Sequence, residues 1–125
     1  MRLLLDTHAL IWWLEDSEQL SSDARAAIAD GGNEIAVSAA SAWEMAIKQA
    51  AGKLRVPADL DDAITTSGFS SLSITIEHAL RAGALEPHHR DPFDRMLAAQ
   101  ALVESLTIVT RDPRFQPYGV RVLAA

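Results

Sequence analysis

Apolar residues in this chain occur either in short continuous runs or at helical spacing. Leu3, Leu4 and Leu5 form an uninterrupted run near the N-terminus. Such a run, without strict alternation, is typical of a strand that is buried on both faces of a parallel sheet. The segment 7–14 instead places its apolar residues at helical spacing, which predicts a helix directly after the first strand.

Capping residues, glycines and prolines mark the boundaries of the other elements. Asp91 followed by Pro92, for example, predicts a helix N-cap and first helical position. We expect helices over residues 7–14, 22–30, 41–52, 59–67, 76–82 and 92–104, and strands over residues 3–5, 34–38, 69–74, 106–110 and 120–123. Residues 86–90 and the proline-containing segment 113–117 are expected to be irregular loops.

The alternation of strands and helices on short connections predicts an α/β fold. We expect a central, largely parallel β-sheet that is flanked by α-helices on both faces. A length of 125 residues fits one domain with a continuous core, so residues 1–125 are expected to form a single domain.

Composition excludes several classes of site and adds an expectation about location. The chain has no cysteine, which excludes disulfides, zinc–thiolate sites and thiol nucleophiles. Its longest apolar stretch, 9–14, is far shorter than the ~20 residues of a membrane-spanning helix. We therefore expect a soluble cytoplasmic protein without a membrane partner.

The formal net charge of -6 argues at first against a partner with a phosphate backbone. The charge is unevenly distributed, because residues 1–44 carry eight acidic and two basic side chains, whereas residues 45–125 carry nine of each. Carboxylates that bind a divalent cation also contribute negative formal charge. Net charge alone is therefore indecisive.

Two aspartates occupy equivalent positions in the pattern. Asp6 follows the first predicted strand, and Asp112 follows the strand predicted over 106–110. Ligands of open parallel sheets bind beyond the C-terminal ends of the strands, so the two carboxylates share a site if these strands are neighbours. Clustered carboxylates repel one another, and a hard cation such as Mg²⁺, which prefers oxygen ligands, offsets that repulsion.

Each acidic residue also has a simpler interpretation. Asp6 and Asp112 are suited to cap the segments that follow them, and Asp91 is explained as an N-cap. Asp94 lies in a first helical turn, where the helix dipole favours any acid. A lone helical glutamate such as Glu44 usually faces solvent.

Four segments together resemble the PIN-domain family, specifically the VapC-type toxins of bacterial toxin–antitoxin pairs. They are LLLDTHALIWWL, SAWEMAIKQAAGKL, HHRDPFDRMLAAQAL and TIVTRDPRFQPYGV. The resemblance covers nearly the whole chain. It implies a PIN fold, an endoribonuclease that depends on Mg²⁺ or Mn²⁺, inhibition by a small cognate antitoxin, and a homodimer.

The resemblance also implies roles for individual residues. The catalytic and metal-binding acids are Asp6, Glu44, Asp94 and Asp112. Metal held by the aspartates would activate a water for in-line attack on an RNA phosphate. Residues that accompany them as outer-shell groups are Thr7, Asp91 and Thr110. Arg95 is a candidate phosphate contact because it is adjacent to Asp94. The role of Asp91 stays open between cap and outer-shell ligand.

Other classes of protein fit the sequence less well. Haloacid-dehalogenase-like phosphatases need a second acid two positions after the first, where this chain has His8. A receiver domain needs an acidic residue at the end of a mid-chain strand, and none is present there. A catalytically inactive PIN-like scaffold that binds protein or RNA remains the alternative.

The stretch from His88 to Arg90 is interpreted as a solvated basic loop.

Overall fold

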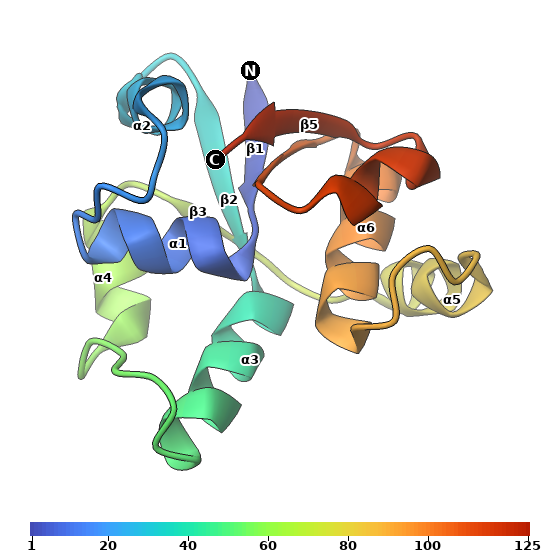
Figure 1. The fold of residues 1–125 in the computed structure, drawn as a ribbon, viewed down its shortest axis with the longest axis horizontal. Helices are drawn as coiled ribbons and strands as arrows, with labels where there is room; N and C mark the ends of the chain where they lie inside the picture. Colours follow the sequence, from blue (N-terminus) through green and yellow to red (C-terminus); the bar gives the residue numbers. More distant parts are fainter.

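The computed structural model describes residues 1–125 and contains a five-stranded, entirely parallel sheet with helices on both faces (Figure 1). The strand order is β3-β2-β1-β4-β5. The strands are β1 (Arg2–Leu5), β2 (Glu34–Ser38), β3 (Ser70–Leu72), β4 (Thr107–Thr110) and β5 (Arg121–Ala124). The expected α/β fold with a parallel sheet is therefore confirmed.

Helices connect most of the strands. They are α1 (Thr7–Leu14), α2 (Ser22–Ala29), α3 (Ala39–Ala50), α4 (Leu60–Thr66), α5 (Ile76–Ala84), α6 (Pro92–Glu104) and the 3₁₀ helix η1 (Pro113–Tyr118). No helix is both long and apolar enough to cross a membrane.

The apolar run of β1 is buried on both faces of the sheet, as its pattern predicts. Leu3 and Leu5 pack in one core cluster with residues of α1 and α2, while Leu4 packs in a second cluster with Leu97 of α6. All three leucines of β1 are inaccessible to solvent. Because burying one such side chain contributes about 1.5–3 kcal/mol, this strand anchors both layers of helices.

Several boundaries differ from expectation. Strand β3 is shorter than the expected 69–74, β5 is shifted by one residue, and α5 continues to Ala84. Helix α3 begins at Ala39 instead of Ser41, because the hydroxyl of Ser38 accepts a hydrogen bond from the N–H of Ala40 and caps the helix earlier. The segment 113–117 was expected to be an irregular loop, and this prediction was wrong, because the segment lies within η1. Proline at the start of a helix fixes a helical φ and needs no N–H partner, and Asp112 caps the turn.

The strand order places a topological switch point at the centre of the sheet. From β1 the chain proceeds outward to β2 and β3, whereas β4, on the opposite side of β1, is followed outward by β5. Connections that leave neighbouring strands in opposite directions open a crevice at the carboxyl ends of the strands. Asp6 after β1 and Asp112 after β4 stand on either side of this crevice.

Candidate active site

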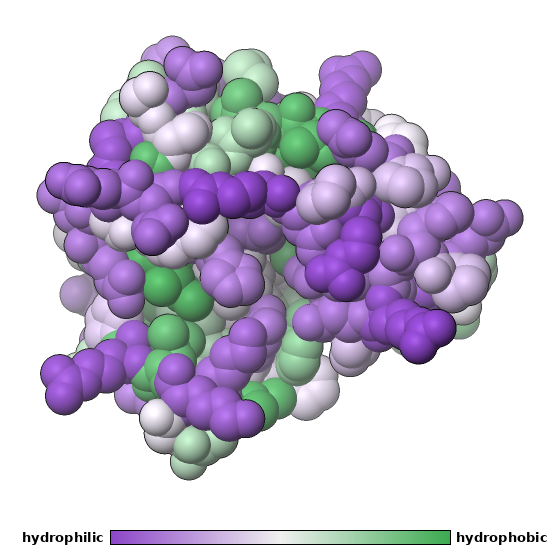
Figure 2. All heavy atoms as spheres, viewed as in Figure 1, coloured by the Kyte–Doolittle hydropathy of each residue, from purple (hydrophilic) through white to green (hydrophobic).

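A cavity of about 470 Å³ lies at the carboxyl end of the sheet. Its acidic lining residues are Asp6, Glu44, Asp91, Asp94 and Asp112. Its cationic lining residues are Lys48, Arg111 and Arg114, with Thr7, His8 and Trp12 completing the wall. Figure 2 shows that hydrophilic side chains dominate this face of the molecule. The fold thus brings all four predicted acids together, although they lie far apart in the sequence.

Asp6 serves as both helix cap and cavity residue, so its two interpretations are compatible. One carboxylate oxygen, Oδ1, accepts a hydrogen bond of 2.8 Å from the N–H of Ala9, and Oδ2 accepts one of 2.6 Å from the hydroxyl of Thr110. Only 6% of Asp6 is exposed. Burial raises the pKa of Asp6 above its ordinary value, and the hydrogen bonds oppose only part of this effect.

Glu44 does not face solvent as a lone helical glutamate usually does. It is buried on α3 and accepts a hydrogen bond of 2.6 Å from the hydroxyl of Thr7 at Oε1. The Nζ of Lys48, one helical turn later, lies 2.8 Å from Oε2. Thr7 and Lys48 therefore fix the orientation of the Glu44 carboxylate at the wall of the cavity.

The start of α6 supplies two acids with different surroundings. Asp91 is the N-cap of α6, where Oδ1 accepts hydrogen bonds from the N–H groups of Phe93 (2.8 Å) and Asp94 (3.4 Å), as the sequence predicts. Asp94 points into the cavity. Burial, followed by the negative charges of nearby acids, raises the pKa of Asp94 to about 7. The repulsion expected of clustered carboxylates is thus concentrated on Asp94.

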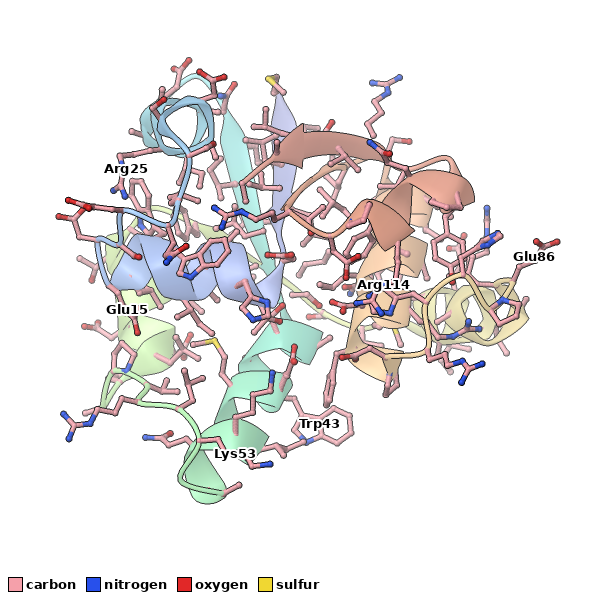
Figure 3. All side chains as sticks on the ribbon, in the orientation of Figure 1. Glu15, Arg25, Trp43, Lys53, Glu86 and Arg114 are labelled. Carbon is pink, nitrogen blue, oxygen red and sulfur yellow. The ribbon has the colours of Figure 1, made fainter.

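Asp112 is compensated by a neighbouring cation. The guanidinium of Arg114 makes two close contacts with it, Nη2 to Oδ2 at 2.7 Å and Nε to Oδ1 at 3.0 Å. This fork holds the pKa of Asp112 well below its usual range. Figure 3 shows Arg114 reaching from η1 across the front of α6. Asp112 also caps η1 by accepting from the N–H of Arg114 at 2.9 Å.

The sequence interpretation missed His89. The structure buries this side chain, which is 2% exposed, and places Nε2 at 2.9 Å from Oδ2 of Asp94 and 3.0 Å from Oδ2 of Asp112. The prediction of a solvated basic loop is therefore wrong for His89. No local pattern distinguishes it from His88, because the burial depends on η1, which packs against the loop only in the folded chain.

The cations of the cavity were also missed, although one left a signal in the sequence. Glu44 and Lys48 have the spacing of a helical ion pair. Arg114 lies two residues from Asp112, and this separation carries no comparable signal.

Arg95, a candidate phosphate contact, does not line the cavity. Its guanidinium donates to four backbone carbonyls, those of Ala82, Leu85, Glu86 and His89, at distances of 2.8 to 3.3 Å. These carbonyls belong to the end of α5 and the loop before α6. Arg95 therefore fastens this loop to α6, and the structure gives it no contact with the acids.

The donor set fits a hard divalent cation. The cavity offers carboxylate oxygens and no thiolate, which is the chemistry that Mg²⁺ and Mn²⁺ prefer. The raised pKa values of Asp6 and Asp94 show that the negative charge on this side is incompletely compensated by protein groups. Asp6, Asp94, Asp112 and Glu44 all line the cavity and are the residues that could supply oxygen ligands to such an ion.

The chain matches known proteins over most of its length. The PIN domain family matches residues 3–120. Over 124 residues the chain is 32% identical to "Ribonuclease VapC22" of Mycobacterium tuberculosis, covering 93% of this chain and 91% of that protein. The fold resembles a chain of VapBC2 from Rickettsia felis bound to promoter DNA, with a TM-score of 0.73, 17% identity and 98% of each chain covered. It also resembles DNA-bound VapBC from Salmonella typhimurium, with a TM-score of 0.69, 19% identity and coverage of 98% and 97%. The chain thus belongs to the PIN-domain family, with a VapC ribonuclease among its relatives.

Proposed function

We propose that this chain is a metal-dependent endoribonuclease that uses Mg²⁺ or Mn²⁺ and acts as the toxin of a VapBC-type toxin–antitoxin pair. The observation that carries the proposal is the group of carboxylates in one cavity at the switch point, with the pKa of Asp94 raised to about 7. Membership of the PIN-domain family and the 32% identity to a VapC ribonuclease support it.

The acids of the cavity have different roles in the proposed hydrolysis of a phosphodiester. A bound divalent cation supplies Lewis-acid chemistry, lowering the pKa of a water and offsetting charge on the phosphate. Asp6, Asp94 and Asp112 would hold that cation. Glu44, which is fixed by Thr7 and Lys48, would either orient the attacking water or bind the cation through a water molecule. The reaction is hydrolysis by water and forms no covalent bond between protein and RNA.

The remaining polar neighbours hold these acids in place. Thr110 donates to Asp6, and Asp91 caps the helix that presents Asp94. These contacts support an outer-shell role for both residues. The cations Lys48, Arg111 and Arg114 gather at the cavity, where they attract the RNA backbone although the whole chain is acidic. Because five acids line the cavity against these three cations, RNA binding there also depends on the charge of the bound divalent cation.

The same relatives support proposals about partners. Solved neighbours include VapBC proteins and a toxin–antitoxin complex from Klebsiella pneumoniae, which covers 98% of this chain at 22% identity and a TM-score of 0.67. We propose that this protein binds a small cognate antitoxin, forms a homodimer and acts in the cytoplasm as a single PIN domain.

Cleavage of structured RNAs by purified, antitoxin-free protein tests the activity. Reactions contain Mg²⁺, Mn²⁺ or EDTA, and compare wild type with Asp6→Asn and Asp94→Asn. Asp62→Asn, which changes an exposed acid on α4, is the matched control. Metal-dependent cutting that only the site variants lose supports the nuclease. RNA binding without cutting in any metal would support the inactive scaffold instead.

A further inference from the structure

His89 is held rigidly between two of the acids by groups outside the metal site. Its imidazole lies against the ring of Phe115, with centroids 5.7 Å apart. Its backbone N–H donates to the hydroxyl of Tyr118 at 2.9 Å, and its carbonyl accepts from Arg95 at 3.3 Å. A side chain that is 2% exposed and fixed on both sides cannot turn away without unfolding the loop.

The hydrogen bonds of His89 define its tautomer. Nδ1 accepts a hydrogen bond of 3.2 Å from the N–H of Asp91, so Nδ1 carries a lone pair and no proton. The proton of the imidazole is therefore on Nε2, which faces Asp94 at 2.9 Å and Asp112 at 3.0 Å. In this tautomer Nε2 donates to Oδ2 of Asp112, and it lies in close contact with Oδ2 of Asp94.

This tautomer excludes Nε2 as a metal ligand. A metal ion binds the lone pair of a neutral imidazole nitrogen, so ligation through Nε2 requires the proton to move to Nδ1. A proton on Nδ1 faces the N–H of Asp91 and leaves that backbone donor without its partner. The His89, Asp94 and Asp112 group has the spacing of a three-ligand site, but its hydrogen bonds oppose that use.

We propose that His89 is a positioning residue of the active site, whose Nε2–H donates to Asp112 while the same nitrogen contacts Asp94, so that the two carboxylates are held at the spacing that a divalent cation needs. The inference rests on the proposed metal-dependent function. Asp94 comes from α6 and Asp112 from the segment after β4, so their separation is not set by one element. Two like charges repel, and a donor between them offsets that repulsion.

The arrangement leaves Asp94 free to bind a cation, whereas Asp112 binds one in competition with Arg114. His89 contacts only Oδ2 of either carboxylate, and every carboxylate oxygen has two lone-pair directions. Outer-shell donors of this kind orient the ligands of a metal, and their loss typically lowers metal affinity about 10–100-fold. His89 thus acts through Asp94 and Asp112 instead of touching metal or RNA.

Two substitutions separate the donor from the rest of the side chain. In His89→Gln the amide nitrogen reaches the place of Nε2 and donates to the acids. In His89→Asn the amide oxygen still accepts from the N–H of Asp91, but the shorter side chain does not reach the carboxylates. The first experiment measures Mn²⁺ affinity by electron paramagnetic resonance and thermal unfolding for both variants and wild type.

We expect His89→Asn to weaken Mn²⁺ binding about 10-fold or more, and His89→Gln to restore most of it. Equal weakening in both variants overturns the proposal, as does unchanged affinity in His89→Asn. If the wild type binds Mn²⁺ but cuts no RNA, only the proposed nuclease activity is overturned. A difference in Mn²⁺ affinity between the two variants then still supports the role of His89. Wild type that binds no Mn²⁺ overturns both.

The tautomer is tested independently by ¹⁵N NMR of the imidazole, with and without Mg²⁺. We expect protonated Nε2 and unprotonated Nδ1 in both conditions. Loss of the Nε2 proton when Mg²⁺ is added makes His89 a ligand, and a proton on Nδ1 without Mg²⁺ contradicts the tautomer. Either result overturns the proposal. This readout does not depend on cleavage or on the stability of any variant.

Discussion

Asp6 and Asp112 look equivalent in the sequence and differ in the folded protein. Each follows a buried parallel strand, and each caps the helix that comes next. Asp6 has only neutral partners, the Thr110 hydroxyl and the Ala9 N–H, and burial raises its pKa. Asp112 has the guanidinium of Arg114, which lowers its pKa.

The difference shows that the site has two electrostatic sides. Uncompensated charge is concentrated on Asp6 and Asp94, whereas Asp112 is already paired with a cation. A divalent cation gains most where protein groups compensate least. We therefore expect Asp6 and Asp94 to contribute most to metal affinity, and Asp112 to bind metal in competition with Arg114.

The largest expected effect comes from Asp6→Asn. We expect RNA cleavage with Mg²⁺ to fall about 100-fold or more, because the variant removes a charge that binds the metal. In EDTA we expect the Tm to rise by about 5 °C, because a poorly compensated buried carboxylate is removed while asparagine keeps the cap. Cleavage assays and thermal scans measure the two effects.

Asp112→Asn sharpens this comparison. It should also reduce cleavage, but without a rise in Tm, because the carboxylate that it removes is stabilised by Arg114. A lower Tm for Asp6→Asn than for wild type in EDTA would contradict the contrast between the two aspartates.

The pH dependence of stability tests whether the charge of Asp94 is poorly compensated by the protein. The pKa of Asp94 is about 7 when folded, against an ordinary value of 3.8. The folded state of the metal-free protein therefore binds this proton more tightly than the unfolded state. The resulting contribution of Asp94 to the unfolding free energy is fully present below pH ~4 and is lost as the pH rises through ~7. We expect the unfolding free energy in EDTA to fall on the order of 2 kcal/mol between pH ~5 and ~8.

Urea unfolding at the two pH values measures this change. Asp94→Asn should remove most of it, and saturating Mg²⁺ should remove it in wild type, because the cation replaces the proton. A slope that persists unchanged in Asp94→Asn assigns the effect to another group.

Thr110→Val tests the link between the two aspartates. The Thr110 hydroxyl donates to Asp6 at 2.6 Å and accepts from the N–H of Asp112 at 3.0 Å. Removing it should cost about 1–3 kcal/mol of unfolding free energy, because two buried polar partners are lost. The pKa of Asp6 should rise further, as carboxyl NMR measures. Thr110→Ser, which keeps the hydroxyl, is the control and should stay close to wild type.

The smallest effect on stability is expected from Arg114→Gln, because this arginine is exposed. The pKa of Asp112 should rise toward its usual range, because the cause of its depression is removed. The depressed pKa contributes stability above pH ~4 that is lost at lower pH, so the variant should be less sensitive to acid in this range. A carboxyl ¹³C titration measures the shift. Arg114→Lys keeps the charge without the fork and should give an intermediate pKa.

The sequence predicted the framework of the fold well. The run Leu3–Leu5 indicated a strand buried on both faces, and Asp91 with Pro92 located the start of α6, because these signals are local. The expected start of α3 at Ser41 was wrong, and so was the loop expected where η1 forms. Both depend on caps, at Ser38 and Asp112, whose geometry is set at the ends of strands in the folded chain.

For the site, the strand-end positions of Asp6 and Asp112 were visible without knowledge of any family. Glu44 needed the resemblance, because nothing in its helix distinguishes a buried glutamate from an exposed one. His89 was missed altogether. Its burial depends on Phe115 and Tyr118 of η1, which lie more than twenty positions away in the chain.

The sequence by itself determined which residues form strands and helices and placed acids at the ends of two strands, because hydrophobic spacing and capping act over a few neighbouring residues. Only the tertiary structure decided that Asp6 and Asp94 hold poorly compensated charge, that Asp112 is paired, and that His89 lies between two carboxylates. The physical reason is that charge state depends on burial and on the partners within a few ångströms. These partners come from segments that meet only when the sheet assembles.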